Sequence, residues 1–418
     1  MAAALTPAVL GFVGSGRVRE RPYGLYRVLR AADPVHRSPL GFWVVSTHAD
    51  VSALLRHPDV GCDAARVDST LLRLGPLRRV MGTTAGDPSS GPFVDMIEQF
   101  LLFRDPPDHA RLRSLVSRAF TPRRIAGLEH RVAALTDAMI APLRGRSDFD
   151  LMGELAYPLP ARVICELIGL PEEDHALIAR HGPALAVGLD PSPLVAPAAM
   201  AAADVAVEEL TEHLRGHVRS RRARPRDDLL SDLVRAEQDG DRLSEQELIA
   251  TLVLLLVAGH ETTANLIGNA VRALDRHPAQ RDRLAHDPAL AATAVEELLR
   301  LDPPVQLTQR ITLAPIEVGG RVIPPGSIVV LLLAAANRDP AAFADPHHVD
   351  LAREANPHVS FGAGAHFCLG AALARLEGRI VLPALFRARP GLRPVRPLPR
   401  HRDSLAIRGH QRLLVGSR

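Results

Sequence analysis

Apolar residues recur at intervals of three and four over most of the chain, which is the spacing that places them on one face of an α-helix. Eight segments in the first 240 residues show this pattern and predict amphipathic helices. They are Pro22–Arg30, Asp50–Arg56, Pro107–Phe120, Arg123–Leu143, Pro160–Gly169, Glu172–Ala186, Pro197–Arg222 and Asp227–Glu237. The pattern therefore predicts a mainly α protein.

Alternation of apolar and polar residues, which is typical of strands, is rarer in this chain than the helical spacing. Gly41–Ser46 is one candidate strand, and Leu307–Leu333 predicts a small sheet because Gly and Pro pairs interrupt it. Two segments, Asp59–Arg104 and Gly182–Ala202, show neither period. Irregular segments of this length are commonly lids or binding loops, although surface decoration is an equal alternative.

No internal repeat and no linker divides the chain. We therefore expect a single large domain over residues 1–418, with a flexible N-terminus over the first 20.

A helix of more than thirty residues is expected to cross the core. Ser244 and Glu247 form a capping box, and the pattern continues to about Asp275. Because Leu252–Val257 is apolar on every side, protein must surround the middle of this helix.

Polar residues interrupt this apolar centre at Ala258-Gly259-His260-Glu261-Thr262-Thr263. A helix-interior glycine costs about 1 kcal/mol, and an unpaired buried carboxylate costs more. One interpretation is that Gly259 allows close helix packing while Glu261 reaches solvent or an ion pair. The other is a local opening of the helix, where an acid and a hydroxyl meet a ligand and relay protons.

The charge composition limits the classes of partner that the protein is expected to bind. The 418 residues carry 50 basic and 47 acidic groups, and every basic one is arginine. These arginines are spread along the chain, so we expect no nucleic-acid partner. The first 16 residues carry no positive charge, and the longest apolar runs are too short to span a bilayer, so no membrane contact and a cytoplasmic location are expected.

The three cysteines are Cys62, Cys165 and Cys368, without the spacing of a disulfide framework or zinc finger. The first two are interpreted as small core residues. Cys368 instead follows a loop containing Gly362 and Gly364 and precedes a helix expected over Ala371–Phe386. A helix N-terminus favours the thiolate form of such a cysteine.

This loop, Phe361-Gly-Ala-Gly-Ala-His-Phe-Cys-Leu-Gly370, resembles the cysteine motif of the cytochrome P-450 superfamily in its soluble bacterial form. Ala258–Thr263 resembles the family's AGxETT motif, and Glu297–Arg300 its ExxR motif, in the family's order and spacing. With the segment Asp105–Arg113, the resemblance covers roughly residue 20 to the end. It implies the P-450 fold, with haem between the long central helix and the cysteine loop.

The resemblance implies haem b as the cofactor, with Cys368 as the axial thiolate ligand of its iron and Phe361 packed near the sulfur. Four further residues match the family's haem-propionate contacts. They are His109, Arg113, Arg310 and His366.

Around the bound dioxygen, the resemblance assigns different tasks to neighbouring residues. Ala258 and Gly259 leave room for the gas, Thr262 hydrogen-bonds it, and Glu261 helps to deliver protons. Elsewhere Glu297, Arg300 and Arg353 resemble a buried charge network that we expect to be structural.

The family's substrate cavity corresponds here to residues that are mostly apolar, which suits a mainly hydrophobic small molecule. The candidates are Leu255, Val305, Gln306, Leu307, Leu405 and Ile407, with Gln306 and Thr308 able to hydrogen-bond. No flavin or iron–sulfur segment is recognised, so the resemblance implies a ferredoxin or flavodoxin with its reductase as electron donor. Four arginines on the helices nearest the cysteine side could steer such a donor. They are Arg111, Arg118, Arg375 and Arg379.

The sequence therefore predicts a haem-thiolate monooxygenase that hydroxylates or epoxidises its substrate, in keeping with secondary metabolism. Desaturation or oxidative ring coupling is the nearest alternative, since the same oxidant serves both. A non-catalytic haem sensor would have no need of the pair Glu261 and Thr262. A cysteine nucleophile beside His366 would need a base and oxyanion donors that the sequence does not supply.

Overall fold

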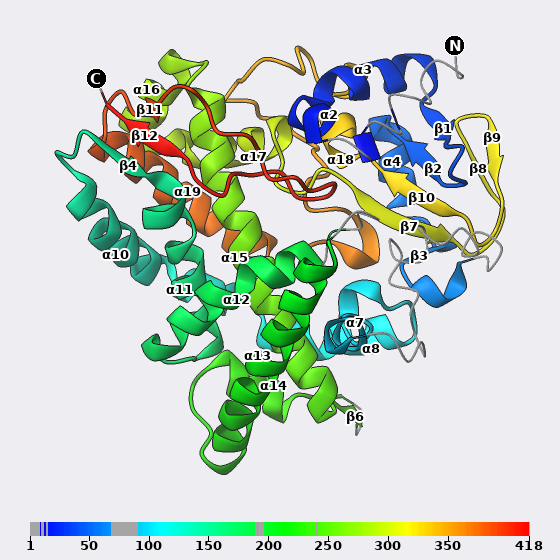
Figure 1. The fold of residues 1–418 in the computed structure, drawn as a ribbon, viewed down its shortest axis with the longest axis horizontal. Coiled ribbons are helices and arrows are strands. Elements are labelled where there is room, and N and C mark those ends of the chain that lie inside the picture. Colours follow the sequence, from blue (N-terminus) through cyan, green and yellow to red (C-terminus); the bar gives the residue numbers. More distant parts are fainter. Residues whose placement is uncertain are drawn as a thin grey trace. The chain divides into compact units, whose positions relative to one another are not determined.

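A computed structural model describes residues 9, 12–13, 16–67, 91–188, 190, 196–238 and 241–417. The chain is mainly helical with small sheets (Figure 1), which confirms the predicted fold class. It forms two compact units. The first comprises residues 1–60, 130–159 and 262–418, and the second comprises residues 61–129 and 160–261. Parts of both irregular segments, 68–90 and 191–195, lie outside the described residues.

The helical period predicted most helices to within a few residues. The observed elements that match are α3 (Pro22–Ala32), α4 (His48–Leu54), α8 (Asp108–Ala119), α11 (Pro158–Ile168), α12 (His175–Gly188), α13 (Pro197–Ala223), α14 (Leu229–Arg235), α15 (Glu245–Leu274) and α19 (Ala371–Ala388). The segment predicted as one helix from Arg123 to Leu143 is instead α9 (Pro122–Gly127), α10 (Glu129–Ile140) and a short turn. Gly127, a poor helix former, lies at the break.

The first unit contains a five-stranded sheet in the order β1-β2-β10-β7-β3. Its strands are β1 (Val35–Arg37), β2 (Trp43–Val45), β3 (Val60–Gly61), β7 (Thr308–Thr312) and β10 (Ile328–Leu331). β10 pairs in parallel with β2 and antiparallel with β7. The predicted strand at Gly41–Ser46 and the sheet within Leu307–Leu333 are therefore confirmed.

The predicted segment Leu307–Leu333 also contains β8 (Ile316–Val318) and β9 (Arg321–Ile323), which pair antiparallel around Gly319 and Gly320. Short strands outside the predicted segments were missed, because two or three residues are too few to show a period of two. They are β4 (Asp148–Asp150), β5 (Glu237–Gln238), β6 (Asp241–Arg242), β11 (Arg393–Pro394) and β12 (Leu414–Gly416). Other elements of the first unit are α2 (Gly16–Glu20), α16 (Pro278–His286), α17 (Ala291–Leu301), α18 (Leu333–Ala336) and the turn η7 (Gly364–His366). The helix α2 occupies the last residues of the segment expected to be flexible, and its Arg19 is buried and bonded to Asp403.

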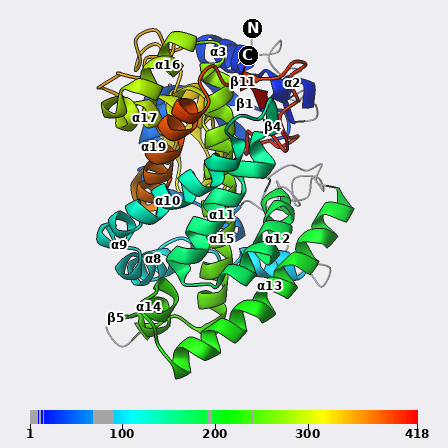
Figure 2. The ribbon, with the colours of Figure 1, turned by 90° about the vertical axis from the view of Figure 1, so that its left-hand side faces the viewer.

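The second unit is almost entirely helical. Its longest helix, α13, packs along α12, and the two run side by side in Figure 2. α7 (Pro92–Ile97) and α14 pack on α13 as well. The short turn η5 (Glu172–Asp174) leads into α12.

The central helix α15 has the predicted start. The Ser244 N–H donates to Glu247 Oε2 at 2.8 Å, and the Glu247 N–H donates to Ser244 Oγ at 3.2 Å, which completes the capping box. The residues from Leu252 to Val257 are all buried, as expected. By length and composition α15 could cross a membrane, but 72% of its most apolar 18-residue window is buried in the structure, which is typical of a core helix.

Glu297 is the centre of a buried charge network in the first unit. Arg300 donates to both of its oxygens, at 2.7 and 2.8 Å, and Arg353 Nε donates at 3.0 Å. The side chains of Glu297 and Arg300 are fully buried. The expected network of Glu297, Arg300 and Arg353 is confirmed.

We expect Glu297→Ala to destabilise the fold by about 3–5 kcal/mol, because it leaves two arginines without their buried counter-charge. Thermal unfolding and haem content per purified chain would measure this. Glu317→Ala removes an exposed carboxyl on β8 and is the control. Equal melting temperatures and haem contents for both variants would contradict the structural role.

Glu377 on α19 is a second buried carboxyl, and it has no such partners. Its Oε2 is buried without a hydrogen bond, and burial raises the pKa of Glu377 well above its ordinary value. The folded chain therefore binds a proton that the unfolded chain releases above the ordinary pKa of about 4.5. Stability should fall as the pH rises past that value, by up to about 1.4 kcal/mol per pH unit.

Glu377→Gln should accordingly flatten the fall in melting temperature between mildly acidic and neutral pH and raise the melting temperature at neutral pH. A series of thermal melts over this range, with Glu317→Gln as control, makes the comparison. Parallel curves for the parent and Glu377→Gln would show that the carboxyl is ionised in the folded state.

Candidate active site

The cysteine loop is shaped by two glycines. Gly362 and Gly364 have φ angles of +68° and +69°, which residues with a Cβ rarely adopt. A Cβ on Gly364 would also lie 2.5 Å from the carbonyl oxygen of Leu55 at the end of α4. The loop therefore requires glycine at this position both for conformation and for close packing.

Buried contacts fix the loop to the sheet of the first unit. Val359 and Ala363 belong to the hydrophobic core around that sheet. The Val359 N–H donates to Asn337 Oδ1 at 2.8 Å, and Ser360 Oγ donates to the Leu299 carbonyl at 2.9 Å. Asn337 and Ser360 are positioning residues that sequence reasoning missed, since neither belongs to a recognisable motif.

Cys368 differs from the other two cysteines in exposure. It is exposed three residues before the start of α19, whereas Cys62 and Cys165 are buried, and none of the three forms a disulfide. Its N–H donates to the Phe361 carbonyl at 2.9 Å, which closes the loop. Burial raises the pKa of Cys165 to about 12, which suits the predicted role of a small core residue.

An arginine and an aromatic ring flank the cysteine. The Arg375 guanidinium lies over the Phe361 ring, 4.5 Å from its centroid, and donates to both oxygens of Glu296 at 2.7 and 2.8 Å. Burial of Glu296 opposes its ionisation, but hydrogen bonds from Arg375 and His358 outweigh this and lower the pKa of Glu296 to about 2. The pKa of Arg375 is raised, mainly by Glu296 and to a lesser degree by Cys368. A fixed positive charge therefore accompanies the sulfur.

Two predicted propionate contacts belong to this unit. Arg310 is buried on β7, and its Nη1 donates to Thr308 Oγ1 at 2.8 Å and to the Gln309 carbonyl at 2.7 Å. His366 is half-buried in η7, two residues before Cys368.

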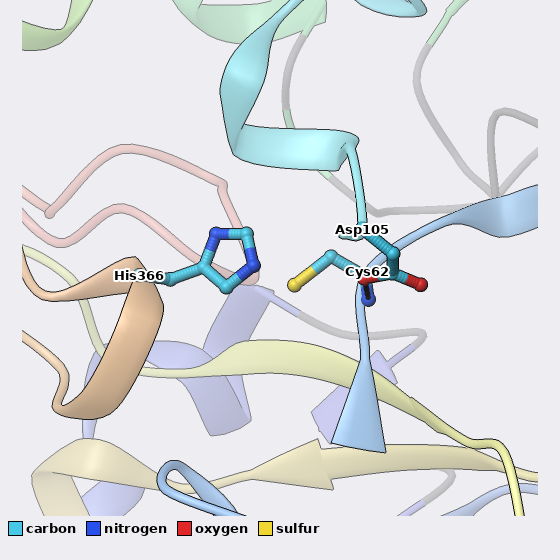
Figure 3. A group of neighbouring side chains, drawn as sticks. All are labelled: Cys62, Asp105 and His366. Atoms are coloured by element: carbon cyan, nitrogen blue, oxygen red, sulfur yellow. Dashed lines mark hydrogen bonds between the residues drawn. The ribbon is translucent and has the colours of Figure 1, made fainter. Parts of the chain in front are cut away.

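The other two, His109 and Arg113, lie one turn apart on α8 of the second unit, as predicted. His109 is buried and Arg113 half-buried. Just before this helix, Asp105 accepts hydrogen bonds from the N–H groups of Cys62 at 2.7 Å and of Asp63 at 3.3 Å, and Figure 3 shows Asp105 beside Cys62. The Asp105 carboxylate thus links the start of α8 to the residues that follow β3.

The centre of α15 carries an accessible stripe. The residues before it are buried, whereas Ala258 is exposed and Gly259 and Thr262 are half-buried. Ala258 and Thr262 are four residues apart and therefore share one face of the helix. Glu261 is 2% exposed, so it does not point to solvent.

The local opening of the helix, which was the alternative interpretation, is not present, because α15 is an unbroken α-helix through Ala258–Thr263. Gly259 serves close packing instead: a Cβ there would lie 3.3 Å from Ile164 Cδ1 on α11. The neighbouring His260, for which no role was predicted, is buried, and its Nδ1 lies 3.0 Å from the place that a Cβ on Gly182 of α12 would occupy. Close helix packing, one of the two interpretations, is thus the observed one for Gly259.

The structure brings together two predicted substrate segments about 100 residues apart. Val305 and Ile407 form an antiparallel bridge, and the Gln306 N–H donates to the Ala406 carbonyl at 2.8 Å. Leu307 and Leu405 are buried. The Gln306 amide donates to the Pro303 carbonyl at 2.7 Å, so that donor is already engaged. Leu255 is buried on α15 in the second unit.

These residues fit a haem held by a thiolate. Cys368 is an exposed thiol just ahead of a helix N-terminus, and Phe367 beside it is 40% exposed, which is unusual for an apolar ring. When bound, a thiolate-ligated haem supplies dioxygen activation, with electron density from sulfur favouring O–O cleavage.

Comparisons with known proteins identify the family. Residues 195–388 match the family model described as Cytochrome P450. A vitamin D(3) 25-hydroxylase of Pseudonocardia autotrophica is 40% identical over 96% of this chain and 95% of its own. The chain belongs to the cytochrome P450 family. An erythromycin C-12 hydroxylase of Saccharopolyspora erythraea is 39% identical over 93% of this chain and 91% of its own.

Among solved structures, P450BioI in complex with an acyl carrier protein carrying hexadec-9Z-enoic acid is similar with a TM-score of 0.85. It is 33% identical and covers 96% of this chain and 100% of its own. The relatives are monooxygenases and hydroxylases, so this P450 is an oxygen-incorporating oxidoreductase with a haem–thiolate cofactor.

Proposed function

We propose that this P450 inserts one oxygen atom from dioxygen into a mainly hydrophobic organic molecule, by hydroxylation or epoxidation, in bacterial secondary metabolism in the cytoplasm. Haem b is the cofactor, and Cys368 holds its iron. The observation that carries the proposal is the exposed Cys368, held by a glycine-shaped loop before α19 in a chain of this family. His109, Arg113, Arg310 and His366 bind the propionates, and Phe361 packs beside the sulfur.

Thr262 and Glu261 deliver protons to the bound oxygen, each in a different role. Thr262 is half-buried on the accessible stripe of α15, where its hydroxyl can donate to a bound oxygen. Glu261, next in the chain, is buried and can pass a proton inward without being open to solvent. Ala258 and Gly259 have little or no side chain, which leaves room for dioxygen.

Hydroxylation is favoured because two of the similar proteins are named as hydroxylases, one of vitamin D(3) and one of C-12 in erythromycin. The similar P450BioI structure contains an acyl carrier protein, so a carrier-bound substrate belongs in any test. The apolar candidates for the lining of the cavity remain Leu255, Val305, Leu307, Leu405 and Ile407, with Gln306 near them.

A ferredoxin or flavodoxin with its reductase supplies electrons. Of the four arginines expected to steer it, Arg118 and Arg379 are exposed. Arg111 pairs with Glu247, and Arg375 pairs with Glu296. Because these carboxylates neutralise part of their charge, Arg111 and Arg375 attract an acidic partner less than Arg118 and Arg379 do.

Optical titration of the ferric protein tests the substrate class. We expect the Soret band to shift from the low-spin to the high-spin position with one class among macrolides, secosteroids, terpenoids and fatty acyl groups, free or on a carrier protein. The shift reports displacement of water from the iron by a nearby ligand. A chain that shows no thiolate-type Soret band after haem supplementation would overturn the role of Cys368.

Thr262→Ala should uncouple the enzyme, so that reduced nicotinamide is consumed while hydrogen peroxide replaces product. Thr251→Ala is a matched control, because the Thr251 hydroxyl donates only to the Glu247 carbonyl within the same helix, at 2.7 Å. The ratio of product to nicotinamide consumed would be measured for both with a surrogate ferredoxin system. Unchanged coupling in Thr262→Ala would remove this residue from proton delivery.

A further inference from the structure

Three metal-ligating side chains converge in the second unit, apart from the P450 motifs. Asp174 closes the turn η5, and His213 and His217 lie one turn apart on α13. One ligand atom from each lies within 4.8 Å of the others. His213 Nε2 is 2.7 Å from Asp174 Oδ1, His217 Nε2 is 2.8 Å from Asp174 Oδ2, and the two Nε2 atoms are 3.2 Å apart.

Hydrogen bonds cannot account for all three of these contacts at once. Each Nε2 carries either one proton or one lone pair in the ring plane. If both nitrogens carry protons toward Asp174, no lone pair is left for the 3.2 Å contact between them. If one carries a lone pair, that lone pair faces a carboxylate oxygen.

The buried carboxylate shows the same conflict. The Asp174 side chain is 4% exposed, yet its Oδ2 accepts no hydrogen bond of good geometry, although His217 Nε2 lies 2.8 Å away. A buried oxygen without a donor is costly. A cation bound by all three groups would satisfy this oxygen and both nitrogens together.

We propose that Asp174, His213 and His217 bind a divalent transition-metal ion, with Zn²⁺ as the expected occupant. Two imidazoles with one carboxylate form a ligand set that zinc accepts. Ligands at the usual zinc distances in tetrahedral geometry lie about 3.3 Å apart, close to the 3.2 Å between the two nitrogens. The nitrogen–oxygen separations of 2.7 and 2.8 Å are shorter, so the carboxylate would move outward on binding the ion.

The surroundings allow the ion to enter and favour its charge. The His213 side chain is 37% exposed and that of His217 is 19% exposed, so the site opens to water, which can provide a fourth ligand. Glu172 and Glu173, exposed on the same turn, add negative charge. Arg221, whose charge acts on His217, is already paired with Asp228 at 2.6 Å.

The expected role is structural. Asp174 comes from the turn before α12, and both histidines come from α13, which packs along α12. The ion would therefore fix the start of α12 to the middle of α13. This inference does not depend on the proposed oxidation, and its test uses no turnover.

Isothermal titration of tag-free, chelator-treated, haem-loaded protein with ZnCl₂ tests the site. We expect one equivalent to bind tightly, and His213→Ala, His217→Ala and Asp174→Asn each to weaken that binding by at least about 10-fold. His130→Ala, which removes an exposed histidine on α10, is the matched control and should bind as the parent does. Far-ultraviolet dichroism and the Soret band show whether each variant is folded.

Zinc-edge X-ray absorption of the one-equivalent complex provides a readout that does not depend on any variant's stability. We expect two imidazole nitrogens and oxygen ligands, and a zinc-dependent rise in melting temperature that the two histidine variants lose. No saturable binding by the parent, binding unchanged in both histidine variants, or a sulfur ligand in the absorption spectrum would each overturn the proposal.

Discussion

The buried carboxylate of Glu297 is the constraint on which the cysteine side of this P450 depends. A carboxylate that is fully buried must be surrounded by donors, and here they come from Arg300, Arg353, the Asp350 N–H and Asn356. Arg300 in turn donates to the carbonyls of Asn337, Pro346 and His348. The irregular chain from Asn337 to Asn356 is thereby fixed to α17, and Asn337 itself holds Val359 and Ser360 at the entrance to the cysteine loop.

Arginine–carboxylate pairs also fix other parts of the chain, in which arginine is the only strong base. The planar guanidinium binds carboxylates through two hydrogen bonds, and Arg375 does so with Glu296 beside Cys368. The same guanidinium lies over the Phe361 ring, and the Phe361 carbonyl accepts a hydrogen bond from the Cys368 N–H, so direct contacts link the charge, the ring and the cysteine. The near balance of 50 basic and 47 acidic residues is thus visible as internal pairing.

The central helix α15 is accessible at its middle because two residues there have little or no side chain, while the helix itself stays unbroken. Ala258 and Gly259 expose the backbone region, while the flanking leucines and valines are buried. The half-buried Thr262 and the buried Glu261 then place an alcohol and an acid next to that gap. The proposed proton delivery by this pair would need no local distortion of α15, since adjacent residues on a helix already point in different directions.

Local interactions were predictable from the sequence alone. The capping box of Ser244 and Glu247, the one-turn spacing of His109 and Arg113, and the glycine-dependent loop before Cys368 all lie within a few residues, where helix and turn geometry fix the outcome. Only the tertiary structure decided the contacts between segments that are distant in the sequence. The role of Gly259 depends on Ile164, which packs against it from another helix. The bridge between Val305 and Ile407 joins two segments that are far apart in the chain. Asp174 meets His213 and His217 only because α12 packs along α13. No period or motif records such contacts, because they arise from the packing of whole elements rather than from the spacing of residues.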